Sequence, residues 1–247
     1  MKTNRKILVI AGLDPSGNAG LLRDLQVMSR FPLTPYAVVT ALTAQTRRRF
    51  FKANVVSPSV FSGQLKAVSP IGQFSAVKIG MLGNEKMVQT LIRFLKSRKN
   101  RPPIVLDPVC DSTTGGVLLT SKGRKLLYEK LVPLVSLWTP NLAEASHFSG
   151  IKIDSKTRMI NAAQKLWSKR KVPALIKGLK HEGRVYDLLF DGKNPRWFSN
   201  SLIPGRHRGL GCALSSLISS NLAMGKKLSI AVKVSRLQNS IKQNSSF

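Results

Sequence analysis

Short apolar runs alternate with helical patterns along most of this chain. The apolar runs predict strands, because they are about as long as buried strands and are bounded by polar or turn residues. Helices are predicted between them, where apolar residues recur every three or four positions. The strands are expected at Ile7–Ala11, Tyr36–Thr40, Ala76–Ile79, Ile104–Leu106, Leu134–Trp138 and Ala174–Ile176. The helices are expected at Ala19–Arg30, Ser59–Ala67, Glu85–Ser97, Lys122–Leu131, Ala143–Phe148 and Thr157–Ser168.

This alternation predicts an α/β fold, with a mostly parallel central sheet covered by helices on both faces. The last third of the chain has a different pattern. Val185–Phe190 and Arg196–Ser199 predict a hairpin around an Asp-Gly-Lys-Asn turn. Two further helices are expected at Gly211–Met224 and Ser229–Ile241.

Short motifs follow five of the expected parallel strands. In open parallel α/β sheets, ligands bind beyond the carboxyl ends of the strands. A motif after one strand would mean little, but motifs after five strands indicate one composite site. The motifs are G12-L-D-P-S-G17, G80-M-L-G83, D107-P-V109, T139-P-N-L-A-E144 and K177-G178.

The length and composition fit one domain with a sizeable core. The chain has 247 residues, of which 43% are hydrophobic, and it contains no internal repeat or linker. We therefore expect a single domain over residues 1–247, with a polar tail from about 242 to 247.

The charge balance is extreme, with 40 Lys and Arg against 11 Asp and Glu and a formal net charge of +29. Such a surface attracts polyanions, whether nucleic acids, membrane surfaces or phosphorylated metabolites. The basic residues are spread along the whole chain, however, and even the densest groups at 47–49, 96–101 and 168–171 form no long tail. Specific nucleic-acid binding is therefore not expected.

The cysteine content and the N-terminus indicate a reducing cytoplasm. Cys110 and Cys212 are the two cysteines of the chain, too few for a disulfide framework, and no Cys/His cluster suggests zinc. The basic start and the apolar run that follows resemble a signal peptide, but the run is short and ends in Asp-Pro. No run approaches the ~20 apolar residues of a membrane span, so no membrane association is expected.

Cys212 follows a glycine turn, G209-L-G-C212, at the predicted start of a helix. Glycines before a helix let backbone N–H groups converge on an anion, and the helix dipole adds partial positive charge. The same dipole lowers the pKa of a thiol. Cys212 could thus serve as a general base beside a transferred phosphoryl group. Taken alone, the motif favours a buried structural cysteine after a flexible turn.

Carboxylates and one glutamine add candidate chemistry to this site. Asp107 and Glu144 follow neighbouring strands and could hold Mg²⁺, directly or through waters, as phosphoryl transfer requires. The carboxamide of Gln45, just past the second strand, could pair with the edge of an aminopyrimidine. The alternative for Gln45 is a solvated loop residue, which spacing does not exclude.

Together these residues resemble the hydroxymethylpyrimidine/phosphomethylpyrimidine kinases of thiamine biosynthesis, within the ribokinase-like superfamily. The segments follow the family order from about residue 6 to about 240, so the resemblance covers nearly the whole chain. They are I10-A-G-L-D-P-S-G-N-A-G20 with Asp24, T40-A-L-T-A-Q45, V77-K-I-G-M-L-G83, V105-L-D-P-V109, T139-P-N-L-A-E144, I176-K-G178, D187-L-L-F-D-G192 and G209-L-G-C-A-L-S-S216.

The resemblance implies a single-domain, three-layer α/β/α fold, usually dimeric, that uses ATP and Mg²⁺. The substrates it implies are 4-amino-5-hydroxymethyl-2-methylpyrimidine and then its monophosphate. Cys212 would be the catalytic base, and Gln45 would bind the pyrimidine in a pocket lined by Gly12, Ala19, Met81 and Val109 and supported by Asp24. The phosphate and metal residues would be Gly209, Leu210, Gly211, Asn141, Lys177, Asp107 and Glu144.

The sequence departs from the family pattern at a few positions, and two alternatives remain open. Arg208 and Leu210 stand where the family has His and Thr, Leu179 and Lys180 replace a Gly-His pair, and R47-R-R-F-F51 replaces a small loop. One alternative is a pyridoxal- or pyridoxine-type vitamin kinase on the same fold. The other is a degenerate kinase scaffold that binds polyanions.

Overall fold

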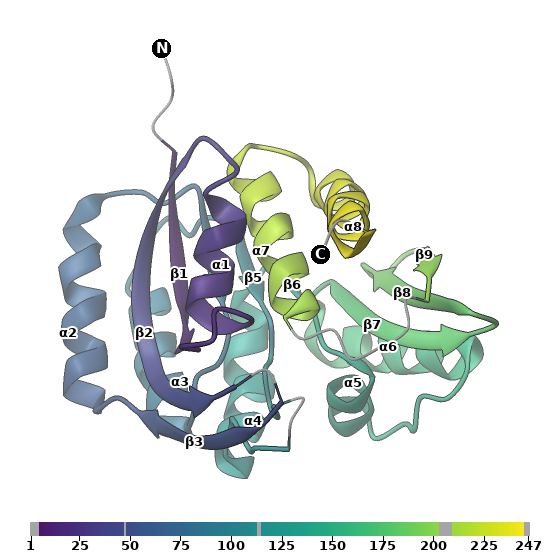
Figure 1. Cartoon of the computed structure of the whole chain (residues 1–247), viewed down its shortest axis with the longest axis horizontal. Helices are drawn as coiled ribbons and strands as arrows, with labels where there is room; N and C mark the ends of the chain where they lie inside the picture. The colour runs from purple at the N-terminus through teal and green to yellow at the C-terminus, as the bar shows by residue number, and fades with distance from the viewer. Residues whose placement is uncertain (1–4, 47, 113–114, 203–208, 245–247) are drawn as a thin grey trace.

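A computed structural model describes residues 5–46, 48–112, 115–202 and 209–244 of the chain. In this part, nine strands form one sheet in the order β3-β2-β1-β4-β5-β6-β7-β8-β9 (Figure 1). The strands are β1 (Arg5–Leu13), β2 (Leu33–Gln45), β3 (Phe50–Val55), β4 (Ala76–Ile79), β5 (Ile104–Leu106), β6 (Leu137–Trp138), β7 (Ala174–His181), β8 (Arg184–Phe190) and β9 (Arg196–Ser201).

The six central strands, β2, β1, β4, β5, β6 and β7, run parallel to one another. β3 at one edge of the sheet and β8 and β9 at the other are antiparallel. The predicted mostly parallel sheet is therefore confirmed. The helices are α1 (Gly20–Met28), α2 (Pro58–Val68), α3 (Glu85–Lys96), α4 (Ser121–Leu126), α5 (Leu142–Ser149), α6 (Lys156–Arg170), α7 (Leu210–Ala223) and α8 (Leu228–Asn244), with helical turns at Ser69–Ile71, Leu127–Leu131 and Val132–Leu134.

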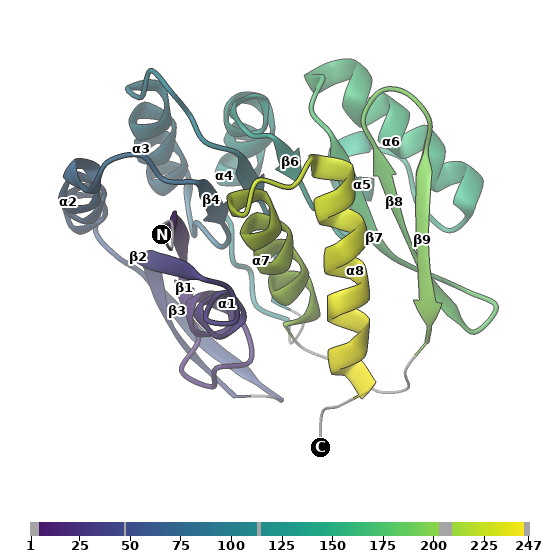
Figure 2. The same cartoon turned by 90° about the horizontal axis from the view of Figure 1, so that it is seen from above.

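Helices cover both faces of the sheet, which gives the predicted α/β/α layers. Figure 2 shows α1, α7 and α8 on one face and α2 to α6 on the other. Successive strand residues point to opposite faces, so β1 contributes to two cores. Leu8 and Ile10 pack with α2 and α3, whereas Ile7 and Val9 pack with α1. Such strands are apolar at most positions, which is why the apolar runs predicted them.

The predicted hairpin is confirmed as β8 and β9 at one edge of the sheet, whereas other edge segments differ from the prediction. β3 was not predicted, and it pairs with the end of β2, which runs on to Gln45. β7 continues to His181 and forms a hairpin with β8. These segments are partly exposed and contain polar residues, so they lack the continuous apolar run that marks the buried strands. At the C-terminus, α8 extends to Asn244, into the segment predicted as a polar tail.

Candidate active site

A cavity of about 940 Å³ opens beyond the carboxyl ends of the parallel strands, beside the start of α7. Residues at the carboxyl ends of β1, β4, β5 and β7 line it, together with the first turn of α7. Of the fourteen predicted site residues, all except Asp24 line it: Gly12, Ala19, Gln45, Met81, Asp107, Val109, Asn141, Glu144, Lys177, Gly209, Leu210, Gly211 and Cys212.

The glycine turn before α7 has the geometry that the sequence suggested. Gly209 is the N-cap residue and has φ 74°, in the left-handed region that favours glycine. A side chain at this position would also overlap the Asn18 carbonyl oxygen of the preceding loop. α7 begins at Leu210, so Cys212 stands in the first turn, where the backbone N–H groups have no partner within the helix.

The Cys212 thiol differs from the prediction in its acidity. Burial raises its pKa to about 11, even though Lys78 and the backbone N–H of Gly20, which donates to the sulfur, oppose that change. Asp107 and Asp24 raise it further. The predicted lowering of the thiol pKa at the helix start is therefore wrong, because loss of solvent outweighs the helix N-terminus. In the free protein the thiol is protonated at neutral pH.

Lys177 and Asp107 form the charged centre of the cavity. The Nζ of Lys177, on β7, donates to Oδ1 of Asp107, after β5, at 2.9 Å. Thr139 Oγ1 donates to the same oxygen at 3.2 Å. Burial opposes the charge on Asp107, but Lys177 and Lys78 outweigh it and lower its pKa. Burial likewise opposes the charge on Lys177, and Asp107 and Glu144 outweigh it and raise its pKa. Both groups are therefore charged.

Asn141 and Glu144 line the cavity and also cap α5. The Asn141 side chain accepts from the backbone N–H of Glu144, and Glu144 Oε2 accepts from that of Asn141, both at 2.9 Å. This reciprocal pair is a capping box. Glu144 Oε1 accepts from the backbone N–H of Cys110 at 3.2 Å. Burial, together with Asp107, raises the pKa of Glu144 to about 7.

One end of the cavity has an apolar wall beside an amide. Met81, Leu118 and Ala41 are buried there, with Val109 packed against them. A side chain at Gly12 would come 2.9 Å from the Met81 sulfur, so the glycine keeps this end open. Gln45 is the last residue of β2, at the rim of the cavity, rather than in a loop past the strand. This end suits a flat heterocycle whose polar edge reaches an amide.

Asp24 lies behind the cavity wall rather than in it. Its side chain is fully buried on α1, where Lys78 donates to one carboxylate oxygen at 2.6 Å and Ser216 donates to the other at 2.7 Å. Asp24 therefore supports the cavity through Lys78, which does line it. The sequence did point to Asp24, but Lys78 passed unnoticed as one lysine within the short apolar strand β4.

The other end of the cavity contains residues that sequence reasoning missed. Asp187 on β8 accepts from the Gly178 backbone N–H at 2.9 Å and forms an ion pair with Arg236 of α8 at 3.0 Å. Burial raises the pKa of Asp187, although Arg236 opposes that change. Asn239 and Lys180 also line this end. Asp187 falls in a family-like segment, whereas nothing in the sequence of α8 marked Arg236 or Asn239.

Some of the positions that depart from the family pattern can be placed. Arg48 lines the cavity, whereas the Arg49 guanidinium lies 4.8 Å from the centre of the Phe51 ring. Leu179 is buried in the core, and its neighbour Lys180 lines the cavity. Arg47 and Arg208 lie outside the described residues.

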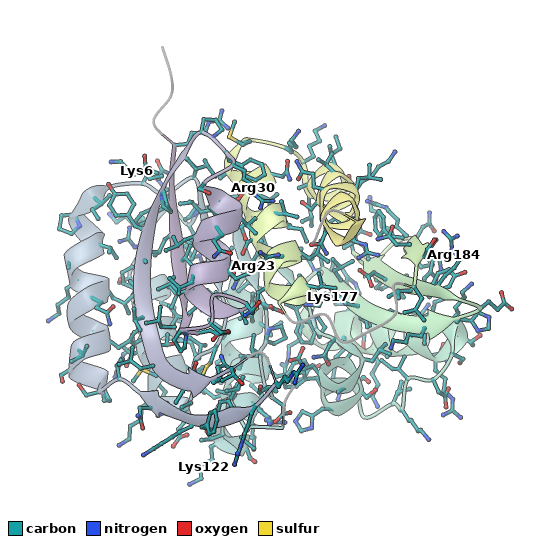
Figure 3. All side chains as sticks on the ribbon, viewed as in Figure 1. Lys6, Arg23, Arg30, Lys122, Lys177 and Arg184 are labelled. Carbon is teal, nitrogen blue, oxygen red and sulfur yellow. The ribbon has the colours of Figure 1, made fainter. Side chains whose placement is uncertain are left out.

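The positive charge is distributed over the molecule. In Figure 3 Lys6, Lys122 and Arg184 lie far apart at the periphery, whereas Lys177 lies near the middle, by the start of α7. A dispersed charge of this kind favours nonspecific attraction of anions over a defined nucleic-acid site. Within the described ranges, no helix is both long and apolar enough to cross a membrane.

Comparisons with known proteins agree with this geometry. A family model described as phosphomethylpyrimidine kinase matches residues 14–246. A hydroxymethylpyrimidine/phosphomethylpyrimidine kinase from Aquifex aeolicus is 37% identical over 231 residues, which cover 93% of this chain and 90% of that protein. The crystal structure of phosphomethylpyrimidine kinase from Clostridium difficile 630 is 30% identical with a TM-score of 0.84, covering 97% of this chain and 99% of that one.

A pyridoxal kinase from Staphylococcus aureus, solved in complex with ADP, has a TM-score of 0.85 and 28% identity, covering 95% of this chain and 86% of that one. The fold and the cavity thus define a ribokinase-like small-molecule kinase. More closely, the chain belongs to the phosphomethylpyrimidine kinase family.

Proposed function

We propose that this protein transfers the γ-phosphoryl group of ATP to 4-amino-5-hydroxymethyl-2-methylpyrimidine and then to its monophosphate, in thiamine biosynthesis. The observation that carries the proposal is the convergence of Gln45, Cys212 and the Lys177–Asp107 pair on one cavity, in a chain that belongs to this kinase family. Two relatives named as thiamine biosynthesis bifunctional proteins, from Arabidopsis thaliana and Geobacter sulfurreducens, support the thiamine pathway; this chain covers 45% and 46% of their lengths.

The pyrimidine would occupy the end of the cavity with the apolar wall. Met81 and Val109 offer contacts to the ring, and the Gln45 amide offers both a donor and an acceptor to the aminopyrimidine edge. Gly12 and Ala19 leave room for the ring to approach the backbone. The hydroxymethyl group would then point toward Cys212 and the start of α7.

In the first phosphorylation, the substrate oxygen forms a bond to the γ-phosphorus while its O–H bond breaks. Cys212, which is a thiol in most molecules of the free protein, would act in its minor thiolate form, which takes the substrate proton and becomes a thiol. The bond between the γ-phosphorus and the bridging oxygen breaks, and its electron pair leaves with ADP. The backbone N–H groups of Leu210 and Gly211 and the ammonium of Lys177 would stabilise the charge on the transferred group.

Magnesium would enter with the nucleotide. No group of three His, Cys, Asp or Glu side chains that could hold a metal is present in the described part of the chain. Asp107 keeps one carboxylate oxygen, Oδ2, outside its bonds to Lys177 and Thr139, and Glu144 lies beside it at the cavity. Mg²⁺ is commonly held by one or two carboxylates together with substrate phosphates and waters. The donors therefore fit, and a bound ion would neutralise phosphate charge.

Pyridoxal is a second candidate acceptor. The likeness to the pyridoxal kinase from Staphylococcus aureus, with a TM-score of 0.85, is the observation that favours it. Pyridoxal and the hydroxymethylpyrimidine are both flat heterocycles that carry a primary hydroxyl group. The apolar wall does not by itself separate them.

Three further features belong to this proposal. One continuous sheet supports a single domain over residues 1–247, and two free cysteines fit a reducing cytoplasm. A homodimer is supported by exposed apolar side chains on β2, β3 and α2, where Leu42, Phe51 and Val60 are more than half exposed.

The test is a coupled ADP-release assay with ATP and Mg²⁺ and three separate acceptors: the hydroxymethylpyrimidine, its monophosphate and pyridoxal. The proposal expects the highest kcat/KM with a pyrimidine. A higher kcat/KM with pyridoxal would mean that pyridoxal, rather than a pyrimidine, is the substrate of the same kinase reaction. Binding of nucleic acid that resists high salt, without ADP release, would instead support the degenerate scaffold.

A further inference from the structure

Lys78 is a charged residue at the centre of the molecule. It stands on β4 between buried apolar residues, and its side chain has no exposed surface. A buried ammonium is costly unless it is paired at close range. The pairing is present, because Lys78 Nζ lies 2.6 Å from Oδ2 of Asp24, which is also fully buried.

The carboxylate that pairs with Lys78 is itself held in place. Ser216, on α7, donates to Oδ1 of Asp24 at 2.7 Å. Asp24 lies on α1 and Lys78 on β4, so the three side chains tie two helices to the central sheet. Both oxygens of Asp24 have buried partners, which fixes the position of the ammonium.

The ammonium of Lys78 lies at the wall of the cavity, close to Gly80. A side chain at Gly80 would come 2.9 Å from Lys78 Nζ and 3.4 Å from the Ala11 methyl group. Lys78, Gly80 and Ala11 all line the cavity. Since Cys212 lies four residues before Ser216, both lie on the same side of α7, the side that faces Lys78 and Asp24.

Charged groups from four elements act on the Cys212 sulfur. They are Lys78 of β4, Asp24 of α1, Asp107 after β5 and Lys177 of β7. Lys78 is the largest of the electrostatic influences on the thiol and lowers its pKa, while Asp107 and Asp24 raise it. Burial opposes the charge on Lys78, but Asp24, Cys212 and Asp107 outweigh it and raise its pKa, so Lys78 remains a cation.

We propose that Lys78 is a positioning residue that acts through Cys212: its ammonium stabilises negative charge on the sulfur, and Asp24 and Ser216 hold that ammonium in place. Its catalytic meaning rests on the proposed function, in which the Cys212 thiolate takes the substrate proton. The electrostatic effect on the thiol does not depend on that function and can be measured without any substrate.

The test is the rate at which iodoacetamide alkylates Cys212 in the full-length protein, with peptide mass spectrometry to separate Cys212 from Cys110. Thiolate is the reactive form, and each unit of pKa changes its fraction tenfold. At about pH 8.5, Lys78→Met should lower the rate by roughly tenfold. Asp24→Asn should raise it several-fold, because it removes a negative charge while Asp107 and the Cys212 thiolate remain as partners that keep Lys78 charged. Lys86→Met, an exposed lysine on α3, is the matched control and should leave the rate unchanged.

The expected changes in alkylation rate, a decrease in Lys78→Met and an increase in Asp24→Asn, separate an electrostatic role of Lys78 from a purely structural one. Both Lys78→Met and Asp24→Asn break the same buried pair, so a structural role would move the two rates in the same direction. A lower alkylation rate in Lys78→Met together with a higher rate in Asp24→Asn supports the proposal, and any other pattern of the two rates overturns it. If either single variant does not fold, the double variant Lys78→Met/Asp24→Asn takes its place, because it removes both charges.

The double variant should be alkylated more slowly than the wild type, because Lys78 acts on Cys212 more strongly than Asp24 does. An equal or faster rate would overturn the proposal. If the wild type released no ADP while the alkylation pattern held, the proposed function would fail and the role of Lys78 would stand. In an active enzyme, Lys78→Met should lower kcat for the first phosphorylation more than it changes KM.

Discussion

The ammonium of Lys177 lies 2.9 Å from the carboxylate of Asp107, although 70 residues separate them along the chain. The parallel strands β5 and β7 bring them together at one edge of the sheet. The pair keeps a cation at the centre of the cavity, beside the helix N-terminus of α7. This is the part of the cavity where nucleotide phosphates are expected.

Lys177→Met should raise KM for ATP and lower kcat, since it removes this cation and leaves Asp107 unpaired. A hydrogen bond to a charged group contributes about 1.5–3 kcal/mol, so we expect a loss of roughly tenfold or more in kcat/KM for ATP. Steady-state kinetics with varied ATP measure it. Lys169→Met, an exposed lysine on α6, is the matched control, and an equal effect of the two variants would argue against a local role.

Replacement of Cys212 should separate the two phosphorylations. The first needs a base for the substrate hydroxyl, whereas the monophosphate attacks through an oxygen that is already anionic near neutral pH. Cys212→Ala should therefore lower kcat of the first step by roughly 100-fold and affect the second much less. Cys212→Ser should retain part of the first rate. Separate assays on the two substrates test this, and equal losses would contradict the base role.

Gln45→Glu should weaken binding of the pyrimidine. The change keeps the shape of the side chain but removes the N–H donors that an amide offers. We expect KM for the hydroxymethylpyrimidine to rise by roughly tenfold, with KM for ATP little changed. Gln73→Glu, at an exposed position outside the cavity, is the control. A change in KM for ATP alone would place Gln45 at the nucleotide instead.

Gly209→Ala should disrupt the turn before α7. Gly209 has φ 74°, and a methyl group there would overlap the Asn18 carbonyl oxygen. The left-handed conformation alone costs a residue with a side chain roughly 1–2 kcal/mol, so the free energy of unfolding should fall by at least that amount. Chemical denaturation measures it. Gly63→Ala, in α2 with open space around it, should instead leave stability equal or higher.

The raised pKa of Glu144 predicts that the free energy of unfolding depends on pH in the absence of nucleotide. Burial, with Asp107, raises its pKa from 4.5 to about 7 in the folded protein. The folded state therefore binds more protons than the unfolded state between these values, and the stability that this group contributes is lost as the pH rises through 7. Relative to Glu144→Gln, which cannot ionise, the wild type should lose about 3 kcal/mol between about pH 4.5 and 8. Parallel unfolding curves for the two proteins would contradict the assignment.

The sequence predicted the buried part of the fold better than its edges. β4 and β5 have the predicted bounds, because strands buried on both faces are apolar at most positions, and β4 keeps that pattern despite Lys78. β3 was missed, since Phe50–Val55 is a partly exposed ribbon that depends on its pairing with β2. Exposed edge strands are stabilised by neighbours that lie elsewhere in the sequence, so local patterns do not mark them.

The site was predictable where its residues follow strands. Asp107 and Lys177 could be placed at one edge, because the carboxyl ends of parallel strands meet there. The Lys78–Asp24 pair was not predictable, since it joins residues 54 positions apart on different elements. Nor was the high pKa of Cys212, because sequence gives the helix start but not the degree of burial that outweighs it.

The most direct test of the account is detection of the phosphorylated pyrimidine itself. Purified protein is incubated with ATP, Mg²⁺ and 4-amino-5-hydroxymethyl-2-methylpyrimidine, and mass spectrometry follows the substrate, with Cys212→Ala in parallel. The account predicts a product heavier by one phosphoryl group and then by two, with the first appearing far more slowly in the variant. If the wild type yielded no phosphorylated pyrimidine above the level of Cys212→Ala, the central claim would be contradicted.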